Sequence, residues 1–84
     1  QPGALQTPIM LFPNPGGSEL HIRFDHTTSL QVRVLDAFGR VHHRQSIEAS
    51  PARLNLEVLE QQLYFVEFTD EAGKKAVRTW MKGE

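Results

Sequence analysis

The sequence predicts an all-β protein, an Ig-like antiparallel β-sandwich of about seven short strands. Several short segments alternate apolar and polar residues with a period of two, which is the pattern of half-buried strands. Turn-forming residues interrupt these segments roughly every 8–12 residues, and this spacing is typical of a sandwich. A β-barrel would show the same pattern and remains the alternative architecture.

Composition narrows the classes of protein that fit. A chain of 84 residues with a hydrophobic fraction of 39% corresponds to one small folded domain. Because it has no cysteine, neither a disulfide nor a thiolate metal site can form, and packing alone must stabilise it. A net charge of -1 gives no reason to expect nucleic acid as a partner. The start Gln1-Pro2-Gly3 lacks the features of a signal peptide, so we expect one piece of a longer protein.

The first part of the chain divides into a linker and two strands. Residues 1–8 hold two prolines and a glycine and are predicted to be a linker, which leaves 9–84 as the domain. A short apolar strand over 9–12 stops at Pro13-Asn14-Pro15, where two prolines fix φ and remove N–H donors. We expect a rigid turn or an edge-strand exit there. Residues 19–24 alternate cleanly and predict a half-buried strand.

A hairpin follows in the middle of the chain. Residues 30–34 alternate again and predict the next strand. The segment Asp36-Ala37-Phe38-Gly39 fits a type I turn followed by a left-handed glycine with a β-bulge. Residues 41–47 are therefore the expected hairpin partner of this strand.

The last third supplies the remaining strands. Residues 53–56 predict a brief strand, and 57–62 are the one stretch that could form a turn of helix. Residues 63–69 are apolar on both faces and predict a central strand. A hairpin loop over 70–73 leads to a last strand over 74–81. On that strand Ala76, Arg78 and Trp80 share one face, and we expect Trp80 in the core.

No motif in the chain points to catalysis. His42 and His43 are neighbours on a predicted strand, so they point to opposite faces and cannot both bind one metal ion. Pairing His21 with either of them across strands is the remaining arrangement, but no carboxylate lies at a useful spacing. There is also no Gly-x-Ser-x-Gly elbow and no phosphate-binding glycine loop. We therefore predict no enzyme activity, no metal, no cofactor and no small-molecule substrate.

The final strand is basic, with Lys74, Lys75, Arg78 and Lys82 along it. One interpretation is protection of a sheet edge, because charged side chains block pairing with another chain. The other is a recognition surface that docks onto an acidic partner. Composition alone favours edge protection.

Three motifs, in order, carry a resemblance to a known family. The first is Leu11-Phe12-Pro13-Asn14-Pro15, the second runs from Val32 to Val41 through Gly39, and the third begins at Leu63-Tyr64-Phe65-Val66 and ends in the basic strand. Over about residues 9–82 the chain resembles the type A C-terminal sorting domain of the type IX (Por) secretion system of Bacteroidetes. One position departs from the family pattern. Gln62 replaces a usual glycine, and a positive φ there would cost about 1 kcal/mol.

The resemblance implies a secretion signal that directs its parent cargo through the periplasm and across the outer membrane, to the cell surface or the extracellular space. It also implies an outer-membrane translocon, shuttle and sortase proteins as partners, no nucleic acid, and a monomer or weak dimer. A surface sortase usually removes the domain, and Gly3 and Ala4 lie in the expected cleavage linker. The recognition residues so implied are Pro13, Asn14, Pro15, Gly39, Tyr64, Lys74, Lys75, Val77, Arg78 and Lys82.

Other functions stay open beside this one. The same fold could be an uncleaved Ig-like docking module, or an adhesive or carbohydrate-binding module of a cell-surface protein. Carbohydrate modules usually present a row of exposed aromatic side chains, and this chain has only Tyr64 and Trp80 besides its phenylalanines. A plain structural spacer is the third alternative.

Overall fold

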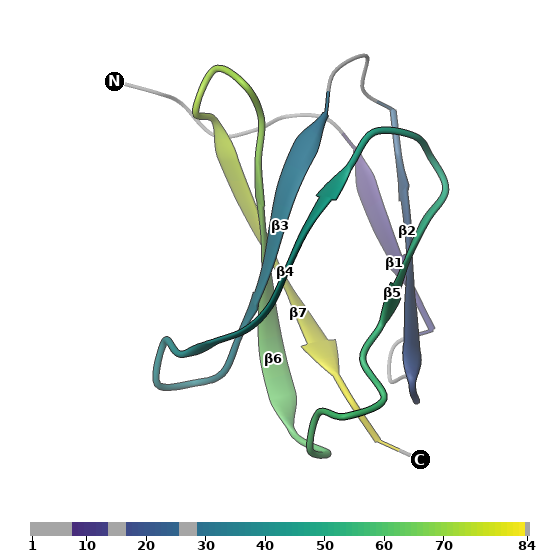
Figure 1. Cartoon of the computed structure of the whole chain (residues 1–84), viewed down its shortest axis with the longest axis vertical. Coiled ribbons are helices and arrows are strands. Elements are labelled where there is room, and N and C mark those ends of the chain that lie inside the picture. The colour runs from purple at the N-terminus through teal and green to yellow at the C-terminus, as the bar shows by residue number, and fades with distance from the viewer. Residues whose placement is uncertain (1–7, 14–16, 26–28, 84) are drawn as a thin grey trace.

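A computed structural model shows two antiparallel sheets packed face to face (Figure 1). It describes residues 8–13, 17–25 and 29–83. Within them lie seven strands and no helix: β1 (Ile9–Phe12), β2 (Glu19–Phe24), β3 (Leu30–Leu35), β4 (Val41–Ile47), β5 (Ala52–Asn55), β6 (Leu63–Thr69) and β7 (Lys75–Met81). One sheet has the order β1-β2-β5 and the other β4-β3-β6-β7, with antiparallel neighbours throughout. The predicted all-β sandwich is confirmed.

The core fills the space between the two sheets because each strand turns alternate residues inward. On β2 the predicted inner face is confirmed, since Leu20 and Ile22 are fully buried and Phe24 nearly so. The alternating buried positions of the larger sheet are Leu30, Val32, Val34, Tyr64, Val66, Phe68, Ala76 and Trp80. Burying this apolar surface supplies the main driving force for folding in a chain without disulfides.

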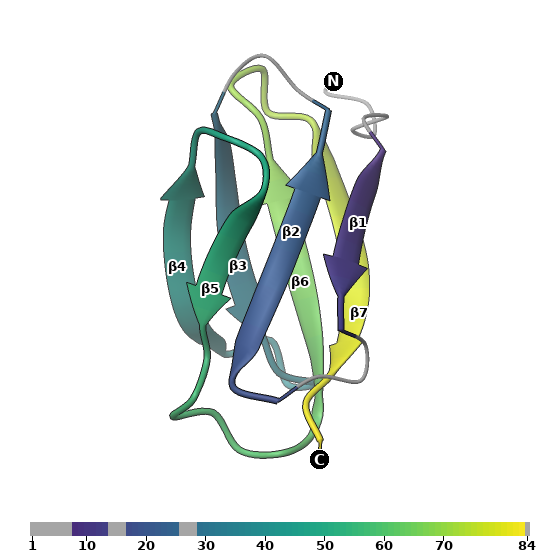
Figure 2. The same cartoon turned by 90° about the vertical axis from the view of Figure 1, so that its right-hand side faces the viewer.

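The strand order places β6 and β7 as the sequence predicts. β6 lies between β3 and β7, which confirms its central position. β7 is an edge strand, and β1 is the edge of the other sheet on the same side of the sandwich (Figure 2). The indole N–H of Trp80 donates a 2.9 Å hydrogen bond to the Pro13 carbonyl just beyond β1. The first and last strands are therefore joined across the two sheets.

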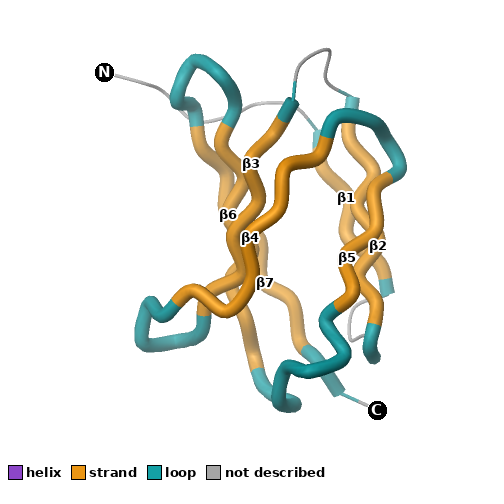
Figure 3. Tube along the Cα trace, in the orientation of Figure 1, coloured by secondary structure: helices purple, strands orange, loops and turns teal. Residues whose placement is uncertain are grey.

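Between β5 and β6 the sequence allows at most one turn of helix, and none forms. Residues 57–62 form a turn, not helix, as Figure 3 shows in its loop colour. The N–H of Leu56 bonds to the Ser18 carbonyl at 2.7 Å, and Leu59 N–H bonds to the Leu56 carbonyl at 3.1 Å. Both leucine side chains are buried. Anchoring these two leucines in the core outweighs helix formation, which is unfavourable in so short a segment.

We expect Trp80→Phe to lower the free energy of unfolding by about 1–3 kcal/mol, because it removes the bond to Pro13 and leaves a small cavity. Urea unfolding followed by circular dichroism measures this change. Met81→Leu is the matched control, since Met81 lies next in β7 on the outer face and is 42% exposed. Equal unfolding midpoints for the two variants would contradict the role assigned to Trp80.

Candidate recognition surface

The predicted recognition residues fall at the two ends of the sandwich and along β7. Pro13 is exposed and follows β1 directly. Asn14, Pro15 and the expected cleavage-linker residues Gly3 and Ala4 lie outside the described residues.

Gly39 closes the turn between β3 and β4. Its φ is +83°, and its N–H bonds to the Asp36 carbonyl at 3.0 Å. The carboxylate oxygen Oδ1 of Asp36 accepts the N–H groups of Phe38 at 2.8 Å and Arg40 at 3.0 Å. The N–H of Asp36 bonds to the Arg40 carbonyl at 3.0 Å, so Gly39 is the extra residue of the predicted bulge, and a separate register shift lies between Val34 and Leu35. The left-handed glycine and the bulge are therefore confirmed.

The turn between β6 and β7 has the same arrangement of an aspartate that accepts backbone N–H groups and a glycine with positive φ. Oδ1 of Asp70 accepts the N–H groups of Ala72 at 2.9 Å and Lys74 at 2.8 Å, and Gly73 has a φ of +86°. Both turns read Asp-x-x-Gly followed by a basic residue. Their shared spacing is the signal in the sequence that predicts a repeated turn. Lys74 thus has a structural role through its backbone.

Asp36 is buried, at 3% exposure, and no other charged side chain is so buried in the described part of the chain. Its Oδ2 atom accepts Nε2 of His42 at 2.8 Å and Nε of Arg40 at 2.9 Å. The hydrogen bond from His42 is the largest cause that lowers the pKa of Asp36 below its usual range; the Arg40 and Phe38 contacts act in the same direction, and burial opposes them. A buried carboxylate with this many donors stays ionised and fixes the turn.

Tyr64 lies inside the protein at 1% exposure. Its hydroxyl donates a 2.7 Å hydrogen bond to the Glu60 carbonyl, as in the tyrosine corner of Ig-like sandwiches. The edge of the His42 ring packs against the Tyr64 ring with centroids 5.7 Å apart. Tyr64 thus supports the turn before β6, and its role in recognition stays a prediction.

Gln62 makes the turn before β6 without strain. Among the described residues only glycines have positive φ, so the anticipated cost of replacing the family's glycine does not arise. The carbonyl of Gln62 accepts the N–H of Lys82 at 3.0 Å, and the Lys82 ammonium donates to the Leu59 carbonyl at 2.8 Å. Lys82 therefore fastens the end of β7 to this turn.

The side chains of β7 divide as predicted between two faces. Lys75 and Val77 are exposed, and Val77 keeps 52% of its surface accessible. Arg78 is half-buried on the same face as Ala76 and Trp80, and its guanidinium donates to the Val77 carbonyl at 3.2 Å. An inward-pointing charge at a sheet edge is a known protection against unwanted pairing.

The backbone of β7 leaves one row of peptide groups directed away from β6. At one end of the β6–β7 pairing the N–H of Asp70 bonds to the Lys74 carbonyl, and at the other end the N–H of Lys82 bonds to the Gln62 carbonyl. Because bonded and non-bonded pairs alternate in an antiparallel ladder, residues 76, 78 and 80 bond to β6. The peptide groups of residue 77 therefore face the outer edge of the sheet.

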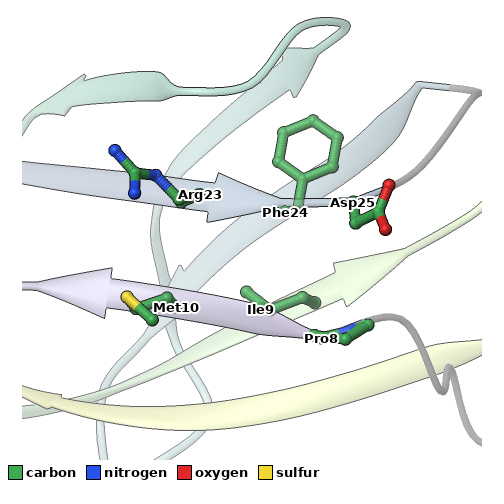
Figure 4. A pocket seen from close by; sticks show the side chains of 6 residues that line it. All are labelled: Pro8, Ile9, Met10, Arg23, Phe24 and Asp25. Atoms are coloured by element: carbon green, nitrogen blue, oxygen red, sulfur yellow. The ribbon is translucent and has the colours of Figure 1, made fainter.

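Several hollows lie at the surface near these strands. One of about 340 Å³ is lined by Arg40, by His42, by Tyr64 of β6 and by residues of the turn that precedes β6, including Gln62. The other, of about 530 Å³, lies between β1 and β2; Figure 4 shows Met10, Arg23 and the flanking side chains around it. Neither of these two hollows gathers the residues predicted for recognition, whereas another, on the outer face of the larger sheet, is lined by both Gly39 and Val77.

In the part of the chain that the structure describes, no three histidine, aspartate, glutamate or cysteine side chains are grouped to hold a metal ion. His21 lies on β2 and His42 on β4, which belong to different sheets. None of the described residues forms a helix able to cross a membrane.

A small Ig-like module with an open edge strand is the class of protein that this geometry defines. A family model described as the secretion system C-terminal sorting domain matches residues 10–82. The chain belongs to this family, the C-terminal sorting signals of type IX secretion. Such a signal implies contact with the secretion machinery and export to the cell surface or the extracellular space. No curated protein matches the chain.

Gly39→Ala is expected to lower the free energy of unfolding by about 1–2 kcal/mol through backbone strain alone. An added Cβ at Gly39 meets no atom within 4 Å, so crowding does not contribute. Gly17→Ala is the matched control, because Gly17 has the same open surroundings without the strained φ. Chemical unfolding of both variants compares them, and an equal loss at Gly17 would refute the strain argument.

Asp36→Asn is expected to lower the free energy of unfolding at neutral pH. It should also reduce the loss of stability that the unchanged domain shows as the pH is lowered. Because the pKa of Asp36 is lower in the folded protein, its ionised form stabilises the fold above about pH 4, and this contribution is lost as the pH falls further. Urea midpoints measured from about pH 7 down to about pH 3 test this. Asp70→Asn in the matching turn is the control, and an unchanged acid response in Asp36→Asn would contradict the prediction.

Proposed function

We propose that this domain is the secretion signal of its parent protein, and that the secretion machinery binds it through the outer edge of β7. The observation that carries the proposal is the position of β7 at a sheet edge, within the segment that matches the sorting family. An edge strand with outward peptide groups can accept a strand from a partner, which gives affinity through main-chain hydrogen bonds.

The predicted recognition residues then take two kinds of role. Lys75 and Val77 are exposed on β7 and are available to a partner. Arg78 covers the Val77 carbonyl and must move before a strand can be added, so it restricts pairing to partners that offer compensating contacts. Gly39 and Tyr64 act indirectly, since they shape the turns that hold the four-stranded sheet.

The remaining steps of the route are part of the same proposal. The domain folds in the periplasm, docks at an outer-membrane translocon with a shuttle protein, and carries its cargo to the surface. A sortase then cuts within the linker, residues 1–8, near Gly3 and Ala4, and leaves residues 9–84 as the released domain. The Pro13-Asn14-Pro15 segment, joined to β7 through the Trp80 bond to Pro13, forms the second contact.

A sorting domain of this kind is not normally an enzyme. The Asp36–His42 contact has the form of a catalytic pair, but its geometry gives it a structural task. Asp36 uses its other carboxylate oxygen to hold the Phe38 and Arg40 N–H groups of its own turn. Tyr64 and Trp80 are both buried, so neither supplies an exposed aromatic side chain of the kind that carbohydrate-binding modules present.

An export assay tests the edge-strand proposal. The chain is fused to the C-terminus of a periplasmic reporter in a type IX-competent bacterium, and surface reporter is measured. We expect Val77→Pro to reduce surface reporter to background, because proline removes an outward N–H without breaking a bond to β6. Val77→Thr is the matched control, since threonine is β-branched and keeps the N–H.

Circular dichroism and thermal unfolding of the purified domain show whether Val77→Pro keeps the fold. Normal export of a folded Val77→Pro fusion would refute the proposal that the secretion machinery recognises β7 by strand addition. Failure of the unchanged domain to export the reporter would refute the sorting proposal itself. The mass of the exported reporter shows whether the linker was cut, and an intact fusion at the surface would instead support a retained docking module.

A further inference from the structure

The outer face of the four-stranded sheet, turned away from the core, carries a cluster of apolar side chains. Leu35 of β3 pairs with both Val41 of β4 and Phe65 of β6, and all three side chains are partly exposed. The neighbouring pair of Leu63 and Met81 is 39% and 42% exposed. These five residues form what we call the apolar floor. A cluster of this kind on the surface of a small domain commonly marks a binding site.

A row of charged residues borders the apolar floor. Arg33 of β3 forms an ion pair with Glu67 of β6, with Nη2 and Oε1 2.6 Å apart. On the other side Arg33 lies directly opposite Arg44 of β4. Like charges at directly opposite positions destabilise a sheet. Arg44 is exposed and makes no hydrogen bond or ion pair with any described residue.

A hollow of about 340 Å³ lies between the apolar floor and the charged row. Leu35, Phe65, Glu67 and Val77 line it, and the Asp36 turn closes one end through Ala37 and Gly39. Beside the turn, the Arg40 guanidinium lies 5.5 Å from the centre of the Phe38 ring, which is 85% exposed. The apolar hollow therefore lies beside the turn that carries Arg40, and Arg44, which has no partner among the described residues, lies on the outer face of the same sheet.

We propose that this face binds a segment of another protein that inserts an apolar side chain into the hollow and presents a carboxylate to Arg44. The apolar floor matches the first group, and the unpaired guanidinium matches the second. A carboxylate at this position also relieves the repulsion between Arg33 and Arg44, so that binding removes a strain present in the free domain.

Other occupants fit this face less well. A polyanion such as a nucleic acid gains its affinity from many cations, whereas this face has Arg33, Arg44 and Lys75, and Arg33 is already paired. A second copy would set the same surplus of positive charge against itself, because two-fold interfaces pair a surface with its own image. Strand addition at β7 uses the backbone of residue 77, whereas this proposal uses the side chains of the outer face, including Arg44 on β4 at the opposite edge of the sheet.

Selection from a displayed library of random short peptides against the folded domain tests the proposal. We expect the enriched peptides to share an aspartate or glutamate close to an apolar residue. Arg44→Glu should weaken their binding about tenfold or more, the loss of one charge-assisted contact. The same variant should unfold at an unchanged or higher temperature, because it turns the repulsive cross-strand pair with Arg33 into an attractive one.

Arg53→Glu is the matched control, because Arg53 is an exposed arginine on β5 of the other sheet and should leave binding unchanged. Leu63→Lys should weaken binding by interrupting the apolar floor. The proposal is overturned if the enriched peptides lack acidic residues, if Arg44→Glu binds them as well as the unchanged domain, or if no peptide is enriched beyond an unrelated β-sandwich. Self-association in sedimentation that Arg44→Glu alters would also overturn it and assign the face to a second copy.

Discussion

Packing between the first and last strands is the constraint on which the rest of this structure depends. Trp80 is fully buried between the sheets, next to Tyr64, whose ring centre lies 6.2 Å away. Its indole N–H reaches the carbonyl of Pro13, 67 positions earlier in the chain. In a domain too small for a large core, one aromatic side chain of this size contributes a substantial part of the burial. It fixes the sheets together on the side where both edge strands lie.

The two Asp-x-x-Gly turns determine how the larger sheet presents its surfaces. Each aspartate bonds to the backbone of its own turn, and each glycine takes the positive φ that closes the hairpin. Asp36 additionally connects its turn to His42 and Arg40. These turns fix the register of β3 with β4 and of β6 with β7. With the register shift between Val34 and Leu35, the β3–β4 pairing places Arg33 opposite Arg44, and the separate pairing of β3 with β6 places Leu35 beside Phe65.

Local pattern predicted much of this architecture. The alternation over 19–24 and 74–81, the glycine turn at Gly39 and the central position of residues 63–69 were all confirmed. Features that depend on distant contacts were missed. The buried contact of Asp36 with His42 follows from the bulge in β4, and the turn over 57–62 follows from the anchoring of Leu59 in the core. The apolar floor could not be foreseen either, because single residues on several strands form it only once their pairing is known.

The burial of Trp80 also links folding to synthesis of the parent chain. β7 completes the larger sheet, and its tryptophan is supplied after every other strand has been made. A ribosome that stops before residue 80 produces a chain without this side chain and without the edge strand. The domain therefore reaches its folded form only when translation has passed residue 80. A domain built in this way distinguishes chains that contain β7 from chains truncated before it.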